Sequence, residues 1–414
     1  MAKTSLKKDA AYVYAGYFLR YASLLILIPY YGRVLGPVGY GQVLAAMSLM
    51  GIVWIIVNYG FSNTGARDLA TAANQEEIDR IFMRQIMARF VLTPVGIAIG
   101  IGGTYFSPLL SSAPLFGVMA TILGLLSAFN LGWFFQGLRQ FRRSMTVEAL
   151  AYPLNVLFVL LSVRSPEDGI YALVALGASA VICTAIAYAL AFRQVRFHEW
   201  VFVDALAEIK NSSTLFLNAM NAMIMITGST YLLSLLSTPE QVGYFGAAER
   251  LIAFGLAMLG PASQILMPSI AHHMKHDESV SGRLIKYGLL LELAYGLCVM
   301  MGGVLLSPFL LPLILGNGFV PSVLPFQILV CLFPFAAFRH AFGNYVLIPQ
   351  KKECWLLLAF TIGNVVNLAI AFVAAGYGGA TGMAAARLAG EIVIAAVLLA
   401  VALRLKMLPL RRLS

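Results

Sequence analysis

About twelve apolar runs, each long enough to cross a lipid bilayer, fill most of this chain and leave only short polar segments between them. A bilayer core about 30 Å thick requires about 20 apolar residues in a helix. Charged residues make up 11% of the sequence, against about 25% in an average soluble domain. The sequence therefore predicts an all-α integral membrane protein. The predicted spans cover residues 10–31, 40–62, 86–106, 114–137, 144–163, 169–192, 214–236, 243–266, 285–306, 322–347, 354–375 and 379–403.

Lysine and arginine are shared unequally between the two sets of loops. An even number of spans places both termini on one side, and the segments on that side hold 21 of the 28 cations. The opposite side holds only Arg33 and Arg164. Cytoplasmic loops are enriched in Lys and Arg, so we predict a multi-pass membrane protein with both termini in the cytoplasm. These loops also explain the net charge of +10, and we therefore expect no nucleic-acid partner.

Short sequence matches recur at an offset of roughly 200 residues. Gly-Tyr-Gly at 39–41 matches Gly-Tyr-Phe-Gly at 243–246, and Ser-Pro at 107–108 matches Ser-Pro at 307–308. The order is the same in both halves, which indicates a parallel internal repeat. Transporters built from such repeats bind their substrate at the interface of the two halves. We expect two six-helix lobes, at residues 1–200 and 201–414.

Several segments resemble a known group of membrane proteins. Residues 33–41 read Arg-Val-Leu-Gly-Pro-Val-Gly-Tyr-Gly, 58–61 read Asn-Tyr-Gly-Phe, 66–70 read Ala-Arg-Asp-Leu-Ala and 135–138 read Phe-Gln-Gly-Leu. They are similar to bacterial polysaccharide-repeat (O-antigen or exopolysaccharide) flippases of the Wzx type, in the multidrug/oligosaccharidyl-lipid/polysaccharide exporter superfamily. The resemblance implies a protein of the bacterial inner membrane whose two six-helix lobes move an undecaprenyl-diphosphate-linked oligosaccharide from the cytoplasmic to the periplasmic leaflet by alternating access.

Five arginines lie inside the predicted spans, whereas eight of the nine lysines lie outside them and the ninth, Lys286, is the second residue of its span. A cation at the bilayer centre costs at least about 2.5–3.5 kcal/mol and is usually found facing a cavity or a partner. The planar guanidinium of arginine binds phosphate and carboxylate oxygens two at a time. We therefore predict a cationic cavity that holds the diphosphate and sugar head group. Its candidate residues are Arg20, Arg89, Arg250, Arg339 and Arg387.

Each arginine also has a simpler interpretation. Arg20 lies mid-span, where the alternatives to a diphosphate contact are snorkelling or a buried ion pair. Arg89 is near the cytoplasmic start of its span, where it either meets the entering head group or snorkels. Arg339 precedes His340, and the two form either a tuned anion site or a packed polar pair. Arg387 lies four residues before Glu391, so we favour an ion pair within one helix.

Three carboxylates inside the spans are candidates for coupling to an ion. Glu249 precedes Arg250, and adjacent helical residues point about 100° apart, so one faces the cavity while the other packs against a neighbour. Glu292 has no charged neighbour in sequence; it either binds a proton or cation, or bridges to Arg250 or Arg387. Glu391 has Arg387 one turn away.

Other functions are less well supported by the residues. No Gly-x-x-x-x-Gly-Lys-Ser/Thr motif is present, and a metal site at His272 and His276 lacks a defined ligand set, so we expect neither cofactor nor metal. An ion-coupled exporter of a drug or anion, on the same fold, is the alternative function. A membrane polymerase or ligase is disfavoured because every outer loop is short. Expected partners are the lipid-linked substrate, membrane lipid, a coupling ion, and polymerase and chain-length proteins of the same pathway.

Overall fold

The computed structural model describes residues 2–196 and 202–405, and within these ranges it contains helices and no strands. The chain folds into two compact units, and the first ends at Met223. The first unit contains α1 (Ala2–Asn58), α2 (Phe61–Thr71), α3 (Gln75–Phe106), α4 (Pro108–Ser111), α5 (Pro114–Ala128), α6 (Gly132–Gly137), α7 (Phe141–Ser162), the 3-10 helix η1 (Pro166–Asp168), α8 (Gly169–Ala191) and α9 (Phe202–Met223). The helix that follows the predicted lobe boundary at residue 200 therefore belongs to unit 1.

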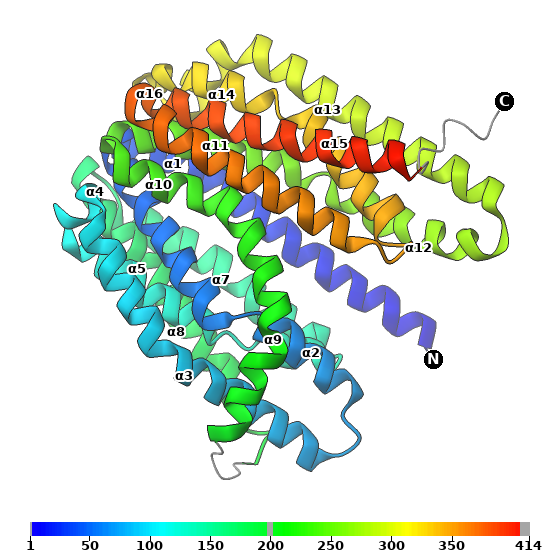
Figure 1. The fold of residues 1–414 in the computed structure, drawn as a ribbon. Coiled ribbons are helices and arrows are strands. Elements are labelled where there is room, and N and C mark those ends of the chain that lie inside the picture. Colours follow the sequence, from blue (N-terminus) through cyan, green and yellow to red (C-terminus); the bar gives the residue numbers. More distant parts are fainter. Residues whose placement is uncertain (1, 197–201, 406–414) are drawn as a thin grey trace. The chain divides into compact units, whose positions relative to one another are not determined.

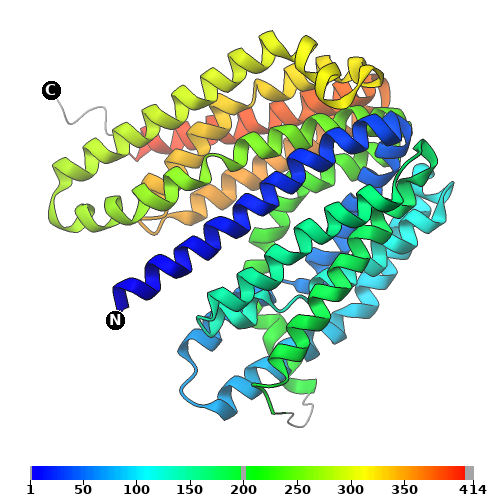
Figure 2. The ribbon, with the colours of Figure 1, turned by 180° about the vertical axis from the view of Figure 1, so that it is seen from behind.

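The second unit begins with a π-helical turn at Ile224 and ends with the longest helix of that unit. Its elements are visible in Figure 1 and, from behind, in Figure 2. They are η2 (Ile224–Gly228), α10 (Ser229–Leu236), α11 (Pro239–Ala257), α12 (Gly260–His276), α13 (Glu278–Leu315), η3 (Asn317–Ser322), α14 (Val323–Val330), α15 (Phe333–Phe342), η4 (Gly343–Leu347) and α16 (Glu353–Arg404). η4, like η2, is π-helical, and η3 is a 3-10 helix.

Nine helices in the described residues are long and apolar enough to cross a membrane by length and composition. Together they overlap every predicted span except 214–236, which corresponds to the end of α9, η2 and α10. Many large apolar side chains on them are exposed, among them Phe106 and Tyr377. Such a surface is expected when lipid, rather than water, surrounds a protein. The predicted all-α membrane class is confirmed.

Two of these helices each contain a sharp turn that separates two predicted spans. In α1 the turn is at Gly36, with φ 64°, and in α16 it is at Gly379, with φ 52°. This left-handed region suits glycine because a Cβ there collides with the backbone. The side chain of Gln241 on α11 accepts a hydrogen bond of 2.8 Å from the N–H of Ala380, directly after the second turn. The turn therefore begins the last span with one of its first N–H groups satisfied.

Gly379→Ala should lower the free energy of unfolding by about 1–3 kcal/mol, because it places a Cβ at positive φ and brings that Cβ against the Gln241 amide. Thermal unfolding of the detergent-solubilised protein measures the change. The matched control is Gly378→Ala, where φ is not positive and a new Cβ meets no atom within 4 Å. Equal stability of the two variants would contradict the strain at residue 379.

Each unit has its own apolar core. In unit 1 an aromatic cluster of Phe82, Trp133, Phe134 and Phe135 joins α3 to α6. In unit 2 buried residues of α15, η4 and α16, such as Phe342, pack together with Ile270 of α12. These cores fix the helices that carry the polar side chains within each unit.

Candidate functional site

Arg20 lies on the exposed surface of α1 in unit 1. One turn earlier Gly16 is buried, and a Cβ at that position would lie 3.4 Å from the sulfur of Met145 on α7. This close approach of α1 to α7 brings Arg20 near Glu148, and the two opposite charges interact electrostatically. Glu148 is a functional candidate that was missed in the sequence, although a carboxylate in an apolar run is a visible signal. Arg20 thus combines exposure with an acidic neighbour.

Arg89 has the opposite environment, since its side chain is fully buried within unit 1. A guanidinium has five N–H donors, and five acceptor atoms of the protein surround this one. They are the carbonyl oxygen of Ala128 (2.8 Å), the carbonyl and side-chain oxygens of Gln85 (2.8 and 3.2 Å), Asn58 Oδ1 (3.4 Å) and Ser62 Oγ (3.4 Å). These contacts leave no N–H group for a ligand.

Two aromatic rings complete the surroundings of Arg89. Its guanidinium carbon lies 5.4 Å from the ring centre of Phe61 and 5.3 Å from that of Trp133, within the range of a cation–π attraction. Arg89 on α3 therefore ties together α1, α2, α5 and α6. This arrangement favours a structural role over both sequence interpretations, the head-group contact and the snorkelling side chain, because the charge reaches neither a cavity nor the surface.

A second buried charge in unit 1, Glu208, was not identified from the sequence. It lies on α9, and its Oε1 accepts hydrogen bonds from Thr64 (2.7 Å) and Gln85 (2.8 Å). Its Oε2 forms an ion pair of 2.8 Å with Arg84, which also pairs with Asp68. Glu208 thereby attaches α9 to α2 and α3. In the sequence Glu208 lies in the polar segment between the predicted spans 169–192 and 214–236, a position that many solvated carboxylates share.

In unit 2 three helices contribute to one buried ion-pair network. Glu391 on α16 is fully buried and pairs with Arg339 of α15 and with Arg387, whose Nη1 lies 3.0 Å away. Arg387 also lies 3.9 Å from Glu249 on α11, which accepts a hydrogen bond of 2.9 Å from Thr230. The predicted ion pair between Arg387 and Glu391 is confirmed. Burial is possible because each arginine faces a carboxylate.

The structure gives Glu292 different partners from those expected. Its Oε2 lies 2.8 Å from Nδ1 of His340, and its Oε1 accepts a hydrogen bond from Tyr345. The expected alternative, a bridge to Arg250 or Arg387, is wrong for Arg387, because that arginine is directed to Glu249 and Glu391. Residue 340 is 48 positions from residue 292, so no helical spacing could have indicated the pair.

Glu249 and Arg250 diverge as their spacing on a helix predicts. The carboxylate of Glu249 is buried inside unit 2, whereas Arg250 is exposed on α11. Arg20 and Arg250 are therefore the two exposed members of the five predicted arginines. The other three are Arg89, which is fully buried, Arg387, which is 4% exposed, and Arg339, whose side chain is 19% exposed and lies over the ring of Phe360.

The histidine cluster does not form a recognisable metal site within the described residues. His273 places its Nδ1 2.8 Å from the carbonyl oxygen of Ser269, one turn earlier on α12. His272 is exposed, and the side chain of His276 lies outside the described residues.

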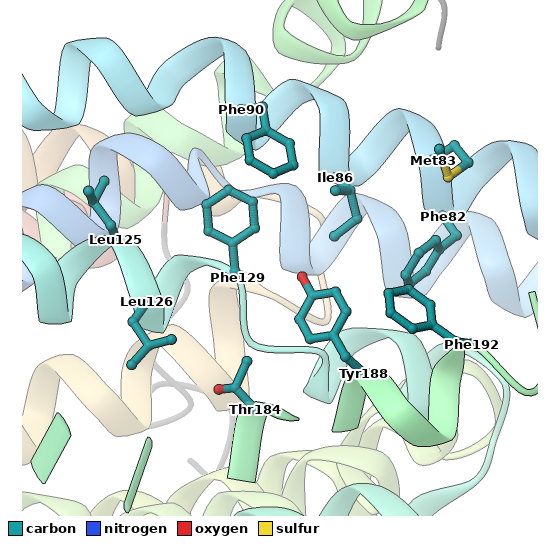
Figure 3. A pocket seen from close by; sticks show the side chains of 10 residues that line it. All are labelled: Phe82, Met83, Ile86, Phe90, Leu125, Leu126, Phe129, Thr184, Tyr188 and Phe192. Carbon is teal, nitrogen blue, oxygen red and sulfur yellow. The ribbon is translucent and has the colours of Figure 1, made fainter. Parts of the chain in front are cut away.

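A groove of about 500 Å³ opens in unit 1 between α3, α5 and α8. Figure 3 shows Phe90 and Phe129 facing each other across it, with their ring centres 4.9 Å apart. Its only polar side chains are those of Thr184 and Tyr188. The groove is therefore too apolar to be the predicted cationic cavity. Its lining consists of Phe82, Met83, Ile86, Phe90, Leu125, Leu126, Phe129, Thr184, Tyr188 and Phe192.

Comparison with known families gives a match to the polysaccharide biosynthesis protein family over residues 6–274, which is more than half of the chain. The chain belongs to this family. Two proteins of similar sequence are both described as putative O-antigen transporters. The one from Shigella dysenteriae is 25% identical over 94% of this chain and 98% of its own length. The one from Escherichia coli strain K12 is 22% identical over 85% of this chain and 86% of its own.

Solved structures show how this family member folds. The lipid II flippase MurJ in an inward-closed conformation aligns with a TM-score of 0.72 at 14% identity, covering 96% of this chain and 87% of that one. An inward-facing multidrug resistance MATE family transporter of the MOP superfamily aligns with a TM-score of 0.62 at 14% identity, covering 94% and 99%. These likenesses confirm the all-α membrane fold, and with the family match they confirm the resemblance found in the sequence.

Proposed function

We propose that this protein is a flippase that moves an undecaprenyl-diphosphate-linked oligosaccharide from the cytoplasmic to the periplasmic leaflet of a bacterial inner membrane. The observation that carries the proposal is the similarity to a putative O-antigen transporter over 94% of the chain. A fold shared with a lipid II flippase supports it. The protein would then be a transporter with no catalytic residues, and its partners would be the lipid-linked substrate, the surrounding lipid and the enzymes that polymerise the product.

In this proposal Arg20 and Arg250 are the first contacts for the diphosphate. Both are exposed, and an exposed guanidinium inside a membrane span is costly against lipid but not against an aqueous cavity. Each guanidinium offers a fork of donors that fits phosphate oxygens. The roles of Arg89, Arg339 and Arg387 in this proposal are structural, because their hydrogen bonds and ion pairs hold the helices of each unit in place.

Transport would follow from alternating access of the two lobes, with residues 1–200 and 201–414 as the proposed six-helix halves. The head group would bind inside the cavity while the polyprenyl chain stays in the bilayer. Transport breaks no covalent bond of the substrate. Its energy would come from substrate binding together with either a driving ion or the consumption of the product. The distribution of Lys and Arg supports an orientation with both termini in the cytoplasm. In this proposal the substrate enters from the cytoplasmic leaflet.

Arg20→Ala should lower flipping by about tenfold or more, since one lost charge-assisted contact to phosphate is worth about 1.5–3 kcal/mol. The readout is accumulation of the unflipped lipid intermediate in cells that lack the native gene, together with transfer in proteoliposomes. Arg20→Lys keeps the charge but loses the bidentate fork, and should recover only part of the rate. The matched control is Arg164→Ala, an exposed arginine outside the predicted spans. Wild-type flipping in Arg20→Ala would contradict this site.

An ion-coupled exporter of a drug or anion is the second candidate. The likeness to a multidrug resistance transporter favours it, as do three carboxylates that are buried in the described part of unit 2, Glu249, Glu292 and Glu391. The two candidates differ in cargo. Purified protein that moves small anions in vesicles, but never a polyprenyl-diphosphate oligosaccharide, would decide for the exporter.

A further inference from the structure

A carboxylate, an imidazole and a phenol meet inside unit 2. Glu292 of α13 is 2% exposed and contacts His340 of α15 and Tyr345 of η4. Gly288 lies one turn before Glu292, and a Cβ there would collide with the Tyr345 ring. Because residue 288 is glycine, the ring packs on the bare backbone of α13 and its hydroxyl reaches the carboxylate. The sequence thus builds this cluster from both sides.

Within the described residues Glu292 pairs with His340 and with no arginine, and Arg283, on α13 itself, acts electrostatically on Asp277. Arg339 is paired with Glu391, and Arg387 is shared between Glu391 and Glu249. Arg250, on the exposed face of α11, acts electrostatically on Glu249. Other titratable or charged side chains described on α13 itself are Arg283, Lys286, Tyr287, Tyr295 and Cys298. Those described on or beside the helices packed against α13 and α15 are His272 and His273 on α12, Cys331 next to α14, Glu240 and Tyr244 on α11, and Glu353, Cys354, Tyr377 and Arg404 on α16.

The pair of Glu292 and His340 is consequently neutral only when it holds one proton. With no added proton, a carboxylate charge remains buried beside a neutral imidazole, which is expensive in a low dielectric. With one proton, the pair is either an ion pair or two neutral groups joined by a hydrogen bond, and the proton belongs to both residues together. The side chain of His340 is 22% exposed, against 2% for Glu292, so the imidazole is the route by which a proton reaches the carboxylate.

We propose that Glu292 and His340 form the binding site for a coupling proton. This proposal rests on the transport function proposed above. His340 and Tyr345 lie on either side of the junction between α15 and the π-helical η4. Movement of this junction away from α13 withdraws both partners from Glu292 at once, exposes the carboxylate to water and changes its affinity for the proton. π-helical turns are frequent at functional sites. Asn344, in η4, donates a hydrogen bond of 3.0 Å to the carbonyl oxygen of His340 and links the two segments.

The experiment measures proton binding without any substrate. Full-length protein in phosphatidylethanolamine/phosphatidylglycerol vesicles is adsorbed on a solid-supported membrane, and a pH step is applied. Wild-type protein should give a transient current as the proton enters the pair. Glu292→Gln and His340→Gln should each lose this current. Glu353→Gln, which removes an exposed carboxylate at the start of α16, should keep it.

A wild-type protein without a transient current, or variants at residues 292 and 340 that retain it, would overturn the proton site. Where these variants fail to give a monodisperse protein, Tyr345→Phe carries the test. Loss of its hydroxyl should shift the pH midpoint of the displaced charge, and an unchanged midpoint would overturn the proposal. Current that behaves as expected, in a protein that moves no lipid-linked oligosaccharide, refutes the flippase function instead. Flipping at equal rates with and without a pH difference, with no current, refutes only the proton site.

Discussion

Glu391→Gln should lower the free energy of unfolding by about 3–5 kcal/mol, the cost of breaking a buried ion pair by removing one partner. The substitution keeps the size of the side chain but removes the negative charge that faces both Arg339 and Arg387. Only Glu249, 3.9 Å from Arg387, would then compensate two guanidinium groups. Denaturant or thermal unfolding of the purified protein in detergent gives the change in stability.

The control for this substitution is Glu353→Gln on the same helix. Glu353 is exposed in the first turn of α16, so its loss should change stability by no more than about 0.5 kcal/mol. The double variant Arg339→Gln/Glu391→Gln should be less destabilised than the sum of the single changes, because it removes one of the uncompensated charges together with its partner. Strict additivity would show that Arg339 and Glu391 do not interact in solution.

The sequence was sufficient for the membrane class and for contacts within one helix. Span-length apolar runs depend on the thickness of the bilayer, and the ion pair of Arg387 with Glu391 depends on a spacing of one helical turn. The glycine turns at residues 36 and 379 interrupt helices that are otherwise continuous. Gly36 lies between two predicted spans and Gly379 is the first residue of the last one, because a reversal of the chain in a membrane protein needs a local conformation that glycine adopts easily.

Contacts between helices could not be predicted in this way. Glu292 finds His340 through the packing of α13 on α15, and Glu208 finds Arg84 through the packing of α9 on α3. Neither pair has a spacing that a helix or turn imposes. The cost of an arginine in a membrane span selected all five candidates, but the same cost can be met by a water-filled cavity or by protein acceptors. Arg20 is exposed and Arg89 is saturated, and only the folded chain separates these two solutions.

Arg89→Met should destabilise the protein by about 3–5 kcal/mol, because it leaves several buried acceptors without a donor, each worth about 1–3 kcal/mol, with partial relaxation of the site. Arg89→Lys should recover part of the loss, since an ammonium has three donors and no planar fork. Unfolding in detergent, followed by circular dichroism, measures both. Arg89→Met is expected to destabilise the protein because α1, α2, α5 and α6 all contact the Arg89 side chain and would lose this common partner.

Arg80→Met provides the matched control on the same helix. Arg80 forms an exposed i,i+4 ion pair of 3.3 Å with Glu76, and exposed pairs contribute at most about 1 kcal/mol. Flipping per folded molecule should be little changed in Arg89→Met, once the amount of folded protein is normalised, because no N–H of this arginine faces a ligand. If Arg89→Met is as stable as Arg80→Met but has lost flipping, the structural role of Arg89 is contradicted. Arg89 would then be a residue that contacts the head group.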